Sequence, residues 1–157
     1  MLTGTTEVAM LEQNKQLARR WFEEVWNQGS EVAIDEMFHP DGKAHGFPDA
    51  QSALEGPEAF KEIHRSFHQI FSDIHVQVED VIAEGDRVAI RWFATLTHRG
   101  DGLGFPATGK TARMEGSSFV TVQGGQIHTG WNHMDFQGLV SRLQQRAAEP
   151  EPDAMAV

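Results

Sequence analysis

Ten residues near the end of the chain, Gln126 to Asp135, hold an indole, two imidazoles, two amides and a carboxylate. In an extended strand Trp131, His133 and Asp135 share one face and Asn132 lies on the other, because successive side chains alternate. An ionised carboxylate is costly to bury without a partner. A carboxyl group on a core-facing strand is therefore a candidate for proton transfer.

Two alternatives stay open at this strand. A helical pattern from Phe136 to Ala147 follows Asp135, and aspartate is among the residues preferred at a helix N-cap. Asp135 is thus either a general acid/base or the cap of the last helix. His133 either shares a ligand with Asp135 or lies on the outer face of a strongly bent strand.

Histidine and carboxylate spacings give little support for a metal site. His64 and His68 stand four residues apart on a predicted helix, as zinc ligands can, but no glutamate directly follows His64. His64 also falls within an apolar helix face, which favours packing. His133 and Asp135 would supply two ligands of a non-haem iron site, with no histidine after them as the third. We expect no metal.

The composition describes one acidic domain. The chain has 157 residues, 13 basic and 23 acidic side chains, a formal net charge of -10 and no cysteine. This charge opposes binding to nucleic acid or to anionic membrane surfaces. The chain contains no apolar run of about 18 residues and no signal-peptide pattern. We expect a cytoplasmic protein that binds small, mostly neutral ligands or protein partners.

Hydrophobic periodicity predicts helices first and strands afterwards. The helices are expected at Glu7 to Gln28, from Ser30 to Pro40, and from Gly56 to about Asp73. The strands are expected near 43–46 and at 74–83, 87–98, 111–122 and 126–135. This order is typical of an α+β domain with helices on one face of a curved antiparallel sheet. The folded domain should span residues 7–147, between a disordered N-terminus (1–6) and a disordered acidic tail (148–157).

Six segments carry a family pattern. They are FEEVWNQGS (22–30), FHPDGKAHG (38–46), GPEAFKEIHRSFHQIFSD (56–73), AEGDRVAIRWFATLTHRG (83–100), FPATGK (105–110) and GGQIHTGWNHMD (124–135). In this order and spacing, over roughly residues 14–145, the chain resembles the SnoaL-like polyketide cyclases of the NTF2-like superfamily. The resemblance implies an NTF2-like cone, with three N-terminal helices on a curved, mostly antiparallel sheet of four to six strands. It also implies a homodimer formed through the sheet.

The resemblance implies a reaction as well. In these cyclases a carboxylate at the end of the last strand is the general acid/base of an intramolecular aldol closure that needs no cofactor, and Asp135 is the matching position. A carboxyl group in an apolar pocket has a raised pKa, which suits this role. His45 matches a histidine that often points into the pocket, and with His133 it is a candidate helper of Asp135.

The resemblance implies a hydrophobic polycyclic or polyketide-like carbonyl compound as the ligand, and the ten phenylalanines and four tryptophans suit the walls of a site for flat rings. The candidate substrate-binding residues are Trp26, Phe67, Phe71, Arg91, Phe93, Glu115 and Trp131. Which face of the strand at 87–98 lines the pocket stays open.

The chain departs from the family pattern on the strand at 111–122. Some relatives carry a histidine there as partner to the aspartate, and this strand has none. The chain also lacks the tyrosine of ketosteroid isomerases, and Phe93 stands where an epoxide hydrolase would need a second carboxylate. A related isomerase or hydrolase, or a non-catalytic ligand-binding or dimerisation domain, therefore remains an alternative.

Overall fold

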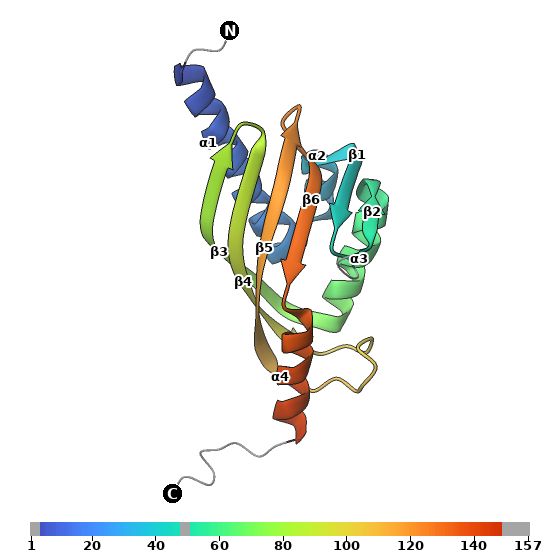
Figure 1. Cartoon of the computed structure of the whole chain (residues 1–157). Helices are drawn as coiled ribbons and strands as arrows, with labels where there is room; N and C mark the ends of the chain where they lie inside the picture. The colour runs from blue at the N-terminus through green and yellow to red at the C-terminus, as the bar shows by residue number, and fades with distance from the viewer. Residues whose placement is uncertain (1–3, 48–50, 149–157) are drawn as a thin grey trace, which may run out of the picture.

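The computed structural model of the chain describes residues 4–47 and 51–148. Helices dominate the first half and long strands the second (Figure 1). The elements are α1 (Gly4–Arg20), η1 (Trp21–Asn27, a π-helix), α2 (Glu31–Met37), β1 (Phe38–His45), β2 (Ala53–Glu55), α3 (Gly56–Ile70), β3 (Phe71–Glu84), β4 (Arg87–His98), β5 (Thr111–Gln123), β6 (Gln126–Met134) and α4 (Phe136–Ala148). None of the helices in the described part of the chain has the length and apolar character that crossing a membrane requires.

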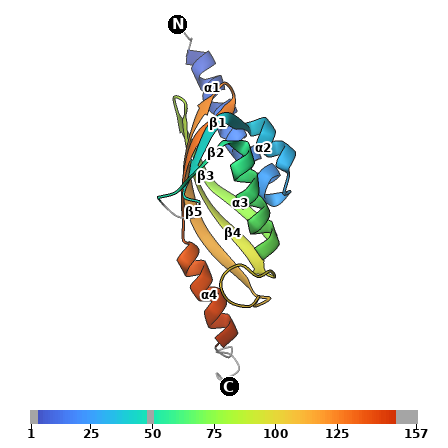
Figure 2. The same ribbon diagram turned by 90° about the vertical axis from the view of Figure 1, so that its right-hand side faces the viewer.

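The strands form one curved sheet in the order β2-β1-β6-β5-β4-β3. Neighbouring strands are antiparallel except β1 and β6, which are parallel. Helices α2 and α3 cover one face, and α4 continues beyond the end of the sheet (Figure 2). This arrangement confirms the predicted α+β layout with helices on one face of a mostly antiparallel sheet.

Alternation along β4 settles which of its faces is inside. The even-numbered side chains are buried: Val88, Ile90, Trp92, Ala94, Leu96 and His98. Arg91 and Phe93 therefore point away from the helices. Burial of each large apolar side chain contributes roughly 1.5–3 kcal/mol, so this face holds the helices against the sheet.

The first predicted helix is two segments of different geometry. After Arg20 the backbone widens into η1, where Gln28 N–H donates to Glu23 O at 2.9 Å, five residues back. Trp21 and Trp26 stand five residues apart and pack on the same ring, Phe60, with centroids at 5.2 and 5.9 Å. The wider turn thus directs both indoles into the core.

Several boundaries differ from the prediction. The first helix begins at Gly4, so residues 4–6 are helical, whereas residues 1–3 and 149–157 lie outside the described residues. The Ser30 side chain accepts a hydrogen bond from Ala33 N–H at 3.1 Å, which confirms its capping role. The second helix ends at Met37 rather than Pro40, because Phe38 is extended and pairs with Ile127 of β6. The three-residue strand β2 was not predicted.

Two histidines of α3 contact backbone carbonyl groups near the end of η1. His64 Nε2 lies 2.7 Å from Val25 O, and His68 Nε2 lies 3.4 Å from Trp26 O. The two imidazoles are 4.3 Å apart. Each side chain therefore contacts backbone carbonyl groups, in agreement with the packing role expected for His64.

The burial of His64 predicts a pH-dependent stability. Burial lowers the pKa of His64, opposed in part by its hydrogen bond to Val25 O. The folded state then binds fewer protons than the unfolded state, whose histidine pKa is about 6.5. The free energy of unfolding should therefore fall as the pH drops below about 6.5. Urea denaturation between about pH 8 and about pH 5.5 measures this fall.

Two variants assign the effect to one side chain. His64→Gln, which cannot titrate, should lose less stability over this pH range than the parent protein. His75→Gln removes an exposed histidine and should leave the parent's pH dependence unchanged. An identical fall in the parent and in His64→Gln would show that another group is responsible.

Candidate functional site

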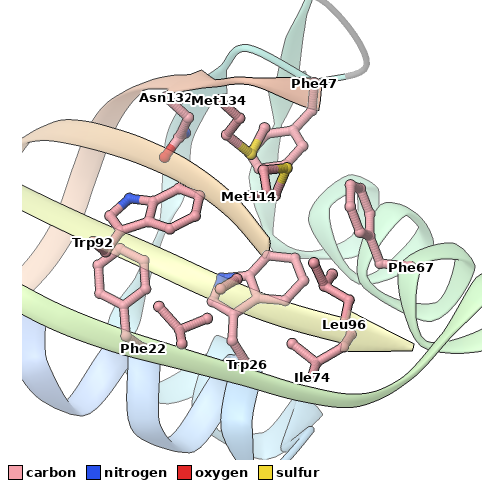
Figure 3. A pocket seen from close by; sticks show the side chains of 12 residues that line it. Phe22, Trp26, Phe47, Phe67, Ile74, Trp92, Leu96, Met114, Asn132 and Met134 are labelled. Carbon is pink, nitrogen blue, oxygen red and sulfur yellow. The ribbon is translucent and has the colours of Figure 1, made fainter. Parts of the chain in front are cut away.

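A cavity of about 40 Å³ lies between η1, α3 and the inner face of the sheet (Figure 3). Its lining is apolar and aromatic with one exception, the amide of Asn132. The lining residues are Phe22, Trp26, Phe47, Phe67, Ile74, Val76, Trp92, Ala94, Leu96, Met114, Asn132 and Met134. This volume holds a few water molecules, whereas ligand pockets usually measure about 300–1,000 Å³. A fused-ring ligand therefore requires side chains of the wall to move.

Of the three aromatic pocket residues predicted near the helices, the structure places Trp26 and Phe67 in the cavity wall and Phe71 outside it. Trp26 packs edge-on against Phe67 with ring centroids 5.7 Å apart, and both side chains line the cavity. Phe71 lies behind them: its ring is 6.0 Å from Phe67, and it belongs to the buried core rather than to the described lining.

A hydrogen-bond chain holds Asn132 at the cavity wall. Trp92 Nε1–H donates to Ser118 Oγ at 3.1 Å, and the Ser118 hydroxyl donates to Asn132 Oδ1 at 2.7 Å. Asn132 Nδ2–H donates in turn to His45 O at 3.0 Å. Ser118 and Trp92 are buried. The amide is therefore held in the wall by Ser118 of β5 and by the carbonyl group of His45 at the end of β1, and Ser118 is itself bonded to Trp92 of β4.

A second cavity of about 30 Å³ adjoins the first. Its wall includes Trp26, Phe47 and Asn132, which also line the first cavity. Trp26 and Phe47 stack with centroids 6.5 Å apart and an interplanar angle of 17°. This stacked pair therefore forms part of the wall of both cavities.

Asp135 lies outside the cavity, so the expectation of an aspartate in an apolar pocket is wrong. Its Oδ1 accepts a hydrogen bond from Gly138 N–H at 3.1 Å at the start of α4, and its Oδ2 is 3.6 Å from Arg142. The side chain is 57% exposed. These contacts are those of a helix cap with an ion-pair partner, and the acid/base role of Asp135 stays a prediction.

A β-bulge explains why the faces of β6 were misjudged. Thr121 pairs with Thr129 while Val122 pairs with Ile127, so β6 has one residue more than β5 at this point, His128. An extra residue reverses the facing of every side chain that follows. Ile127 is buried on the inner face, but beyond the bulge the inner face belongs to Asn132 and Met134.

The other predicted site residues on the sheet lie on its outer face. His45 stacks on Trp131 with centroids 5.6 Å apart and planes at 5°, and His133 lies beside Trp131 in an outer groove. The structure thus brings His45, His133 and Trp131 near one another, but away from the inner cavity and from Trp26 and Phe67. For His133 this is the outer-face alternative that the sequence left open, and a shared pocket with Trp26 and Phe67 is not formed.

Arg91, Phe93 and Glu115 belong to an ion-pair network on the same outer face. Arg91 Nε donates to Asp80 at 2.8 Å and Arg91 Nη1 to Glu79 at 3.2 Å. Arg113 lies over the Phe93 ring at 3.6 Å and pairs with Glu115 at 3.1 Å. Because these groups lie on the outer face of the sheet, they do not contact the inner cavity.

Asn132 is the polar residue of the cavity wall that the sequence prediction does not include. Strict alternation places it on the face opposite Asp135, the residue predicted to face the pocket. No spacing along β6 marks the change of face, because the bulge depends on the pairing of β6 with β5. Within residues 4–47 and 51–148, no three histidine or carboxylate side chains gather closely enough to hold a metal ion.

Comparison with known proteins identifies the relatives of this fold. Residues 16–143 match the family model of the SnoaL-like polyketide cyclases. The chain is similar to a candidate SnoaL-like polyketide cyclase from Jannaschia sp. CCS1, at 24% identity and a TM-score of 0.76, covering 88% of this chain and 94% of that one. A candidate polyketide cyclase from Acidithiobacillus ferrooxidans is 28% identical, with a TM-score of 0.74 and coverage of 85% and 95%.

A third solved structure is IdmH of Streptomyces antibioticus, a candidate polyketide cyclase, at 24% identity and a TM-score of 0.75, with coverage of 84% of this chain and 99% of that one. No curated protein sequence matches the chain. These solved structures confirm the predicted NTF2-like cone.

Proposed function

The chain belongs to the SnoaL-like polyketide cyclase family, and we propose that it promotes a cyclase-type reaction of a flat, apolar carbonyl compound, polycyclic or polyketide-like, in the inner cavity. The observation that carries the proposal is the cavity wall, in which aromatic and apolar side chains surround the single amide of Asn132. Such a wall suits flat rings, and one polar group suffices to orient a carbonyl.

Ring closure benefits from the confinement that this cavity offers. An intramolecular aldol reaction requires two distant carbons of a flexible chain to meet, and holding reacting groups in the correct geometry removes much of that entropic cost. Met114 and Met134 lie in the wall. Because methionine is unbranched and flexible, these two side chains can adapt as the cavity widens around a ligand. This reaction needs no cofactor.

The test is a ring closure that produces its own signal. In a linear diketone with a phenyl group at one end, a methyl group at the other and three methylene groups between its carbonyls, the methyl carbon can attack the phenyl ketone to close a six-membered ring. Loss of water from this aldol product gives a phenylcyclohexenone, whose conjugated absorbance reports the rate. We expect the protein to accelerate this closure over buffer. Binding of the diketone, seen as quenching of tryptophan fluorescence, without any acceleration would contradict the proposal.

A non-catalytic ligand-binding domain is the second candidate function. The observation in its favour is that no histidine, aspartate or glutamate side chain is among the described residues that line the cavity. A general base in contact with the ligand would have to come from the solvent or from a group that moves. The diketone assay separates the two functions, because a binding domain quenches fluorescence and leaves the closure rate unchanged.

Two substitutions of Asp135 separate its possible roles. Asparagine caps helices as well as aspartate, whereas alanine does not. From the contact with Gly138, we expect Asp135→Ala to lower the free energy of unfolding by about 1 kcal/mol and Asp135→Asn to have little effect. If Asp135 only caps α4, neither substitution should change the closure rate. A large loss of rate in Asp135→Asn, with stability retained, would instead support the acid/base role. Urea denaturation and the diketone assay give the two readings.

We further propose that the outer face of the sheet joins two copies of the chain. A row of directly paired residues crosses five strands: His45, Trp131, Phe119, Ala89 and Ile82. Phe119 is 51% exposed, Ile82 67% and Trp131 41%. Contiguous apolar surface of this kind marks interaction sites, and one face meeting itself about a two-fold axis gives a closed dimer.

Substitution of the central ring of this row tests the dimer. Phe119→Asp places a charge where two copies would meet, and we expect it to convert a dimer to a monomer in analytical ultracentrifugation, since an unpaired buried charge is costly. Val32→Asp is the matched control, because Val32 is 66% exposed but lies on α2. A parent protein that sediments as a monomer would contradict the proposal.

A further inference from the structure

We infer that Asn132 presents a hydrogen-bond donor of fixed direction to the inner cavity, so that the site selects ligands by an acceptor oxygen, a ketone or its enolate. This inference rests on the proposed function and specifies the chemistry of its ligand. It follows from the polarity of the hydrogen-bond chain Trp92–Ser118–Asn132–His45.

The two ends of this hydrogen-bond chain, Trp92 and His45, determine the direction of every hydrogen bond in it. The indole of Trp92 can only donate, so the Ser118 oxygen accepts from it and the Ser118 hydroxyl hydrogen is available to Asn132. The backbone carbonyl of His45 can only accept, so the amide atom 3.0 Å from it is the nitrogen of Asn132. Both ends therefore require the same amide orientation, with Oδ1 toward Ser118 and Nδ2 toward His45.

One hydrogen of Asn132 remains after these bonds are counted. The Nδ2 group has two hydrogens, and the contacts of the described residues account for one of them. The oxygen already accepts from Ser118, and Figure 3 shows it on the side of Trp92. The donor that Asn132 can offer to a ligand is therefore the second N–H of Nδ2.

The surroundings make this donor selective. The other residues that line the cavity are apolar or aromatic, so a ligand that leaves the donor unpaired forfeits a hydrogen bond in a poorly hydrated site. A donor held in place before the reaction also favours the charge that develops on a carbonyl oxygen when an adjacent carbon loses its proton. A ketone and its enolate thus meet the same N–H, and the enolate meets it more strongly.

Two flat compounds of nearly identical shape test the inference. Fluorenone carries a carbonyl oxygen, and fluorene carries a methylene group in its place. In the parent protein we expect fluorenone to bind roughly 2- to 10-fold more tightly than fluorene, the range of one net hydrogen bond. In Asn132→Leu the two affinities should become equal. Quenching of tryptophan fluorescence gives the dissociation constants.

Two serine substitutions on β5 test whether the hydrogen-bond chain fixes the orientation of the Asn132 amide. Ser118→Ala removes the hydroxyl group that holds Oδ1, which frees the amide to turn and should reduce the preference for fluorenone. Ser117→Ala removes the neighbouring hydroxyl group, at a position where alternation along the strand directs the side chain to the other face of the sheet. It should leave the preference as in the parent.

The infrared carbonyl band of bound fluorenone provides a reading that needs no variant. A hydrogen bond from Asn132 should move the band to lower frequency than that of fluorenone in hydrocarbon solvent, whereas a band at the hydrocarbon position would overturn the inference. Equal affinity of the parent protein for fluorenone and fluorene would also overturn it while leaving the cavity a ligand site. If neither compound binds, the proposed function itself fails, and the inference fails with it.

Discussion

Replacement of Ala94 with leucine should abolish the binding of flat ligands in the inner cavity. Ala94 is 2% exposed and lies in the cavity wall, and the substitution adds three carbon atoms to a space of about 40 Å³. We expect affinity for fluorenone to fall on the order of a hundredfold, with a parallel loss in the diketone assay, because the ligand would have to displace a side chain that fits no other space. Fluorescence titration and the closure rate measure the two effects.

The cost to folding must be separated from the loss of binding. Overpacking a core position costs about 1–3 kcal/mol, so Ala94→Leu should be less stable but still folded. Thr95→Leu places the same leucine side chain at the next residue of β4, which faces outward, and should bind fluorenone as the parent does. Unchanged affinity in a folded Ala94→Leu protein would place the ligand elsewhere, with the outer groove beside Trp131 as the first alternative.

Gly46→Ala should destabilise the protein more than Gly85→Ala, the other glycine substitution with a positive φ. Gly46 has a φ of 100°, and a Cβ atom there would lie 2.2 Å from the carbonyl oxygen of Asn132. Backbone strain and the clash with a rigid group should together lower the free energy of unfolding by about 2–5 kcal/mol. Displacement of β6 at Asn132 should also weaken the preference for fluorenone. Urea denaturation and fluorescence titration test both effects.

A second glycine isolates the contribution of the clash. Gly85 also has a positive φ, 58°, but a Cβ atom there would meet nothing within 4 Å. Gly85→Ala should therefore lose only the conformational part, about 1–2 kcal/mol. Equal losses in the two variants would show that β6 can shift away from Gly46 at no cost.

The arrangement of elements could be predicted from the sequence because it depends on hydrophobic periods that are visible there. The strand at 87–98 has the bounds of β4, and the helix opened by Gly56 and Pro57 is α3. Strand β2 was missed because three residues are too short to show a period. The π-helical turn was not predicted, because the apolar residues between Glu7 and Gln28 fit the period of a single α-helix.

The candidate site was predicted only in part, for a physical reason that concerns one residue. Side chains on helices, Trp26 and Phe67, were placed in the cavity because they belong to wide apolar faces. On β6, strict alternation from Ile127 led to Asp135 as the pocket residue. The bulge at His128 depends on pairing with β5, a neighbour that local alternation does not include, and it moved Asn132 inside instead.

That bulge makes the chemistry of the cavity depend on how β6 pairs with β5. If the bulge straightened, with His128 kept and paired opposite Thr121, uninterrupted alternation from Ile127 would turn Trp131 and His133 toward the helices and Asn132 outward. A pairing shift of one residue would therefore exchange an amide for an imidazole in the wall of the same scaffold. Relatives of this fold that differ in reaction are expected to differ in whether their last strand carries the bulge.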